Sequence, residues 1–155
     1  MFLNIPDFNP YDSSEAGTSG IAVAPGSHLG IVTGEFPAPP SAANAIIAIQ
    51  LPSTSGTGTP AFVDWVVAQL PNDPAGNPVS MGCDPHTVTA YVSPNTGKAI
   101  GLVTDYGATL CYVGGTPQYV VLIDLQALLS APRTPGTHTA SLPLPSGVVT
   151  FVKTH

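Results

Sequence analysis

The chain contains nearly the same six-residue segment twice, about 70 positions apart. Residues 29–34 read LGIVTG and residues 100–105 read IGLVTD, and the two align without a gap. Two further pairs of segments match in the same order: 22–25 (AVAP) with 91–94 (YVSP), and 46–49 (IIAI) with 120–123 (VVLI). Three matches in one order indicate an internal repeat, which restricts the fold to two copies of one unit.

Turn-forming residues determine the secondary structure that each copy can adopt. The 16 glycines and 18 prolines interrupt the chain so often that long helices are excluded. Between them lie eight short apolar runs rich in β-branched residues, which we interpret as strands: 21–25, 28–36, 45–51, 61–70, 88–93, 99–106, 119–129 and 147–153. The run at 45–51 is almost entirely apolar, which is typical of a strand covered on both faces. The best helical candidate is LQALL at 125–129.

These runs predict an all-β protein made of two tandem four-stranded antiparallel repeats. We assign 20–71 to the first repeat and 88–155 to the second, with an N-terminal arm or edge strand at 1–19 and a linker at 72–87. The alternative is a single β-sandwich in which the repeat corresponds to two duplicated sheets. Gly30 and Gly101 occupy the same place in both copies. Because glycine inside a strand often marks a close backbone approach, we expect neighbouring strands to pass closely at both positions.

The segment AYVSPNTGKAIGLVTD at 90–105 resembles the YVTN-type β-propeller repeat, and Tyr91 begins the aromatic-Val opening of that repeat. VVLIDLQ at 120–126 resembles the V-x-V-I-D strand of the same family, with Asp124 in the Asp place. The first copy departs from the pattern, because Ala22 replaces the aromatic residue. The resemblance implies two propeller blades. The family includes surface-layer-associated and lactonase-like proteins of bacteria and archaea, so the resemblance does not fix an activity.

Two blades alone leave apolar surface uncovered. A closed propeller has about four to eight blades, and each repeat buries its apolar face only on a neighbour. We therefore expect the chain to associate with copies of itself into a ring or a filament, and the alternative is that it forms part of a longer propeller. A surface glycan or another protein is a second candidate partner. The residues expected at this interface are Phe62, Trp65, Val67, Val149, Phe151 and Val152.

Charge excludes several classes of partner. Three basic residues against nine acidic ones give a net charge of −6, so no basic patch is present to bind nucleic acid.

No run of 18 apolar residues occurs, and we expect neither membrane insertion nor a signal peptide in this chain. The low lysine content, with abundant Thr, Ser, Gly and Pro, favours an extracellular or cell-surface location, and the periplasm is the alternative.

The densest polar cluster is GCDPHTVT at 82–89. Cys83, Asp84 and His86, together with Cys111, have the chemistry of a metal site. We favour a simpler interpretation, in which Asp84 begins an Asp-Pro turn, His86 lies at the surface, and the two cysteines either form a disulfide or stay as free buried thiols.

Catalytic motifs are missing from the sequence. No G-x-S-x-G or H-E-x-x-H motif accompanies Asp84 and His86. We therefore expect a non-enzymatic structural or binding module without cofactor or metal. The alternative function is a lactonase-like or other hydrolytic propeller fragment that uses Asp84 and His86.

Overall fold

The computed structural model describes residues 17–35, 45–52, 63–77, 79, 88–105 and 119–154. These ranges form β1 (Gly17–Ala24), β2 (Leu29–Glu35), β3 (Ala45–Gln50), β4 (Asp64–Gln69), β5 (Val88–Val92), β6 (Ala99–Asp105), β7 (Tyr119–Asp124), α1 (Leu125–Leu129) and β8 (Val149–Lys153). The all-β prediction is confirmed. One strand falls on each predicted run, and α1 falls on LQALL.

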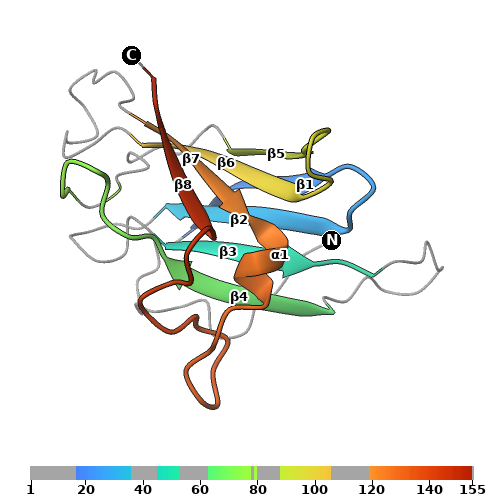
Figure 1. Cartoon of the computed structure of the whole chain (residues 1–155). Coiled ribbons are helices and arrows are strands. Elements are labelled where there is room, and N and C mark those ends of the chain that lie inside the picture. The colour runs from blue at the N-terminus through green and yellow to red at the C-terminus, as the bar shows by residue number, and fades with distance from the viewer. Residues whose placement is uncertain are drawn as a thin grey trace.

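The strands form two four-stranded antiparallel sheets. The first sheet has the order β1-β2-β3-β4 and the second has the order β5-β6-β7-β8, so consecutive strands pair in both. The sheets pack on each other chiefly through β1 and β5, and α1 contacts β3 and β4 of the first sheet as well as β6 and β7 of the second (Figure 1). Within the described ranges, no helix has the length and apolar character needed to cross a bilayer.

The middle strands of the two sheets pair in the same register. Gly30 of β2 lies opposite Ile49 of β3, and Gly101 of β6 lies opposite Ile123 of β7. This is the pairing expected from the sequence alignment, which matches the two glycines and the two isoleucines. Residues of β2 and β3 therefore have equivalent positions in β6 and β7.

The first strands do not follow that alignment. Ala24 pairs with Leu29 in the first sheet, whereas Tyr91 pairs with Ile100 in the second. Tyr91 is thus equivalent to Ala24 and not to Ala22, because the second hairpin is longer. A shift of two residues leaves each side chain on the same face of the sheet, since the period of a strand is two.

Alternation along the strands gives each sheet two faces. The inner face of the first sheet consists of Leu29, Ile31, Ile46, Ala48 and Val66, and its far face consists of Val32, Ile47, Ile49, Trp65 and Val67. The inner face of the second sheet consists of Ala90, Gly101, Val103, Val121 and Ile123, and its outer face consists of Tyr91, Ile100, Leu102, Val120, Leu122 and Val152.

The main hydrophobic core joins the two inner faces. Its buried side chains come from both sheets and from Leu125, Leu128 and Leu129 of α1. A smaller cluster of Val32, Ile47 and Ile49 lies on the far face of the first sheet. Residues 46–49 of β3 are therefore fully buried on both sides, which confirms the expectation for this apolar run.

The two matched glycines lie where other groups come close. A Cβ added to Gly101 would lie 3.0 Å from Cδ1 of Ile31, which projects from the first sheet. A Cβ added to Gly30 would lie 2.9 Å from the carbonyl oxygen of Ala22 on the neighbouring strand. The expected close approach is confirmed at both glycines, and at Gly101 it is an approach between the sheets.

Asp124 fixes the beginning of α1. Its carboxylate accepts a hydrogen bond of 3.0 Å from the backbone N–H of Ala127, which satisfies a free donor of the first turn. Lys98 donates to the other carboxylate oxygen at 2.6 Å, and Asp124 is 6% exposed. The Asp predicted from the family pattern therefore serves as a helix cap that is held by a lysine of the preceding hairpin.

Candidate interaction surfaces

The outer face of the second sheet is apolar and accessible to solvent. Ile100, Leu102, Val120 and Leu122 in the two central strands are half-buried. Tyr91 and Val152 in the two edge strands are 38% and 45% exposed. Thr89, Thr104 and Thr150 pair with these residues and lie on the same face. A sheet face of this kind is the form of surface that binds another protein surface.

The equivalent face of the first sheet is closed. Leu102 is equivalent to Ile31, and Val120 is equivalent to Ile46, and both isoleucines are fully buried. They are covered by the inner face of the second sheet and by α1, which share the main core with them. The two sheets therefore carry the same kind of apolar face, and it is covered in the first sheet and open in the second.

The predicted interface residues of β8 divide between the two faces of the second sheet. Val149 and Phe151 pack against the main core, and Phe151 meets Tyr119 edge-on with ring centroids 5.9 Å apart. Val152 alternates with them and lies on the outer face. Of these three residues, Val152 is the one that lies on the outer face.

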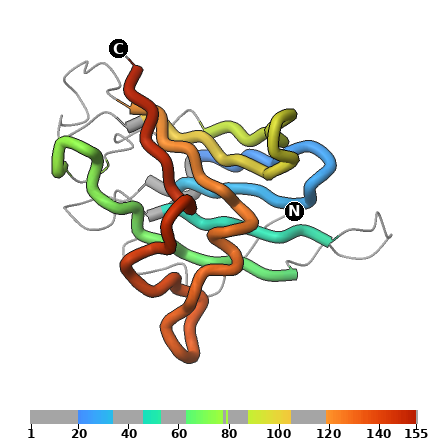
Figure 2. The backbone as a smooth tube through the Cα atoms, viewed as in Figure 1, coloured from blue at the N-terminus to red at the C-terminus, as the bar shows by residue number. Residues whose placement is uncertain are grey.

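The predicted interface residues of β4 lie at a strand edge that the chain itself covers. The backbone N–H of Val67 donates to the carbonyl of His138 at 2.8 Å, and the N–H of Ala140 donates to the carbonyl of Val67 at 2.8 Å. A parallel bridge joins Val67 to Thr139. Figure 2 shows this segment, between α1 and β8, running beside β4. Trp65 and Val67 pack against the small cluster on the far face, and Phe62 lies outside the described residues.

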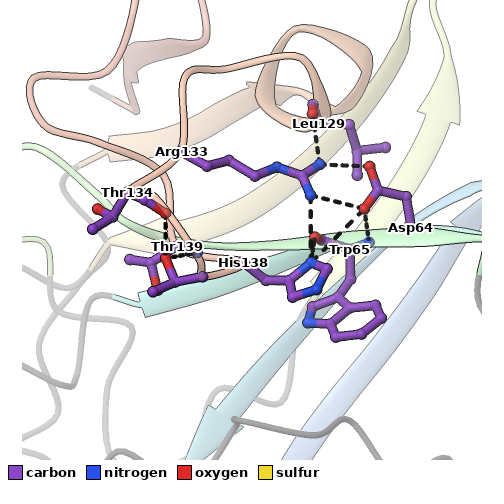
Figure 3. Close-up of polar contacts among 8 residues, drawn as sticks. Asp64, Trp65, Leu129, Arg133, Thr134, His138 and Thr139 are labelled. Atoms are coloured by element: carbon purple, nitrogen blue, oxygen red, sulfur yellow. Dashed lines mark hydrogen bonds and ion pairs between the residues drawn. The ribbon is translucent and has the colours of Figure 1, made fainter.

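A polar cluster holds this segment in place. Arg133 donates two hydrogen bonds to the carboxylate of Asp64, from Nη1 to Oδ1 at 2.9 Å and from Nη2 to Oδ2 at 2.5 Å. Its Nη2 also donates to the carbonyl of Leu129 at 3.0 Å. His138 stacks on Trp65, with ring centroids 3.7 Å apart and an angle of 15° between the planes. Figure 3 shows the guanidinium, the carboxylate and the imidazole close to one another, with Nδ1 of His138 3.9 Å from Oδ1 of Asp64.

The charges in the cluster stabilise each other. The hydrogen bonds from Arg133 hold the pKa of the Asp64 carboxyl below its ordinary value, although partial burial acts in the opposite direction. The same contact raises the pKa of Arg133. The two-point geometry is the form of arginine–carboxylate pair that fixes orientation as well as distance.

His138 can serve the cluster in either neutral tautomer. Its Nδ1 lies 3.3 Å from Nη1 of Arg133, which is a donor, and 3.1 Å from the carbonyl oxygen of Trp65, which is an acceptor. An unprotonated Nδ1 accepts from Arg133, and a protonated Nδ1 donates to Trp65. The ring is thus satisfied by groups that position the loop, which is a structural role.

A shallow open groove lies between Pro71, residues 142–147 and Val149. Ser146 is the one polar side chain among its lining residues. Because a substrate site needs several polar groups that converge on the substrate, this groove does not have the chemistry of an active site. Within the described part of the chain, no group of three or more His, Cys, Asp or Glu residues is placed to hold a metal ion.

The candidate metal, disulfide and catalytic residues lie in the second half of the linker and between β6 and β7. Cys83, Asp84, His86 and Cys111 all lie outside the described residues. The disulfide, the metal site and the Asp84–His86 dyad therefore stay predictions.

Sequence reasoning missed the cluster around Asp64. Arg133 is one of only three basic residues in the chain, and it stands in a proline-rich stretch with His138 nearby. Basic residues are rare in this sequence, so an arginine in a loop was the available signal that an ion pair with a carboxylate holds the loop. Nothing in the local sequence identified Asp64 as that carboxylate.

Comparison with known proteins gives no relative from which a function could be transferred. No protein-family model, curated protein or solved structure matches this chain. The resemblance to the YVTN-type repeat therefore rests on the sequence segments themselves.

Proposed function

We propose that the protein is a non-enzymatic structural module that associates with copies of itself through the outer face of its second sheet. The observation that carries this proposal is the contrast between Ile31, which is fully buried, and its equivalent Leu102, which lies on an open apolar face. Burying such a face removes apolar surface from water, which stabilises the associated state by about 25 cal/mol for each Å² buried.

The direction in which the sheets stack supports a propeller-type repeat as part of this proposal. The inner face of the second sheet contains Val121 and Ile123, and the equivalent residues Ile47 and Ile49 form the far face of the first sheet. The face of the second sheet that packs on the first sheet is therefore equivalent to the far face of the first sheet. Equivalent faces of the two sheets point in the same direction. Blades that follow one another around a propeller stack in this manner.

An extracellular or cell-surface location is part of the same proposal. It rests on the composition, with few charges and many Thr, Ser, Gly and Pro residues. A module of this type at a surface would act by assembly and not by turnover.

The first test is the mass of the protein in solution over a wide range of concentration. Analytical ultracentrifugation is expected to give a mass above the 15.7 kDa of one chain, rising with concentration. The double variant L102K/L122K places like charges on both copies and is expected to give the mass of one chain at every concentration.

Val63→Lys is the matched control, because Val63 is 61% exposed and precedes β4 in the first sheet. It introduces the same side chain away from the outer face and is expected to associate like the unchanged protein. Circular dichroism shows whether each variant keeps its β structure. A mass of 15.7 kDa for the unchanged protein at all concentrations contradicts the proposal.

A further inference from the structure

We propose that the partner on the outer face of the second sheet is the same face of a second copy, so that assembly stops at a two-fold pair. This inference rests on the proposed function, and it specifies which surface the second copy presents. It replaces the ring or filament expected from the sequence with a closed dimer.

An open-ended assembly needs two different faces that fit each other. Within one chain, the inner face of the second sheet covers the inner face of the first. If another copy continued the stack in the same direction, the far face of its first sheet would contact the outer face of the second sheet of this copy. That far face is already covered at its centre, because Ile47 and Ile49 are fully buried and Val32 is 3% exposed.

The two flanks of the far side stay accessible, at β1 and at Val63 just before β4, which is 61% exposed. Ile21 and Val23 of β1 are 54% and 41% exposed, and they pair with Val32 and Gly30. Accessible flanks beside a covered centre do not form a continuous surface that could receive a flat sheet across its full width. The far face therefore does not offer the surface that continued stacking requires.

The outer face has the shape needed to meet its own copy. Leu102 lies opposite Thr89 on one neighbouring strand and opposite Leu122 on the other, and Leu122 lies opposite Thr150. Large central side chains are therefore flanked by smaller threonines. Two copies related by a two-fold axis can interdigitate in this pattern, as the facing sheets of a sandwich do at a separation of about 10 Å.

The charge on this face permits the contact despite a net charge of −6 on each chain. Among the described strand residues of the second sheet, Asp124 is the acidic residue with the register of the outer face, at the end of β7 opposite Ile100. Lys98 neutralises it at 2.6 Å. The central residues are uncharged, so two copies meet without like charges facing each other across the contact.

The test combines mass with the position of cross-links. Tyr91, in an edge strand and 38% exposed, is replaced by the photoreactive amino acid benzoylphenylalanine, which is also aromatic and needs no change at either cysteine. Chains that carry benzoylphenylalanine are mixed with chains that lack it, and the mixture is irradiated. Mass spectrometry then identifies the cross-linked peptides that join different copies. The same replacement at Val63, which is exposed just before β4, is the control and is expected to give no such links.

The expected result is a mass that levels off at two chains of 15.7 kDa, with cross-links from position 91 to residues of β5–β8 in the other copy. Cross-links to β1–β4, or a mass that keeps rising beyond two chains, overturn this inference and leave the proposed self-association standing. A protein that stays at one chain at all concentrations overturns both.

Discussion

Arg133 and Asp64 lie 69 positions apart in the chain and meet in a two-point ion pair. The pair joins the loop after α1 to the first residue of β4. Next to it, the loop adds a short parallel bridge to β4 at Val67. The second half of the chain thus completes the edge of the sheet formed by the first half.

Replacing Arg133 with Gln is expected to lower the free energy of unfolding by about 1 kcal/mol, because the pair is only partly exposed and the carbonyl of Leu129 also loses a donor. The midpoint of urea unfolding measures the change. Lys153→Gln, an exposed charge removal in β8, is the control and is expected to shift stability by less than about 0.5 kcal/mol. If the two variants lose the same stability, the hydrogen bonds of Arg133 to Asp64 and Leu129 contribute no more than an exposed surface charge does.

The contribution of this pair is expected to depend on pH in the acid range. The pKa of Asp64 is lowered in the folded protein, so the unfolded chain binds a proton more readily there. The stabilisation is therefore complete above the ordinary carboxyl pKa of about 4 and is lost as the pH falls through the lowered value. Urea midpoints of the unchanged protein and of Asp64→Asn are expected to differ at neutral pH and to converge in acid. A difference that stays constant with pH would contradict this origin.

Gly101→Ala is expected to destabilise the protein by about 1–3 kcal/mol, because the new methyl group would lie 3.0 Å from Cδ1 of Ile31. Ile31→Val removes that atom and is expected to recover part of the loss in the double variant. Thermal or urea unfolding of the two single variants and the double variant measures the coupling between the sites. Additive effects would show that the close approach of the two sheets at Gly101 is not the cause.

Two substitutions separate the roles of Asp124. Asp124→Ala removes both the cap of α1 and the bond from Lys98, and is expected to cost about 1–3 kcal/mol. Asp124→Asn keeps an oxygen that can cap the helix and loses the charge, so it is expected to cost less. Urea unfolding of both variants at neutral pH measures the difference. If Asn is as costly as Ala, the contact with Lys98 and not the cap supplies the stability.

The strands and their order were predictable from sequence because they depend on local patterns. Most apolar runs have Gly or Pro next to at least one end, and the aligned glycines at 30 and 101 place the middle strands in register. The alignment of the first strands was wrong by two residues, since Tyr91 is equivalent to Ala24 and not to Ala22. The longer second hairpin hides this offset, because a shift of two does not disturb the alternation of faces.

The surfaces were less predictable, because they depend on contacts between distant segments. Val149 and Phe151 are of residue types that also occur at protein interfaces. Their positions in the alternation of β8, however, turn them toward the core. Val67 was expected at the interface with another copy, and the bridge to Thr139 comes from a stretch that has no strand pattern. Sequence periodicity identifies two faces of a strand, but only packing determines which face stays open.

The bridge at Val67 has a consequence for synthesis of the chain on the ribosome. His138 follows Trp65 by 73 positions, so β4 leaves the ribosome well before the segment that completes its edge. During that interval the backbone groups of Val67 lack the partners that they have in the finished protein, and nascent chains on neighbouring ribosomes can pair there. Slow translation between β4 and the 138–140 segment would lengthen the exposure and favour aggregation, whereas fast translation would protect the product.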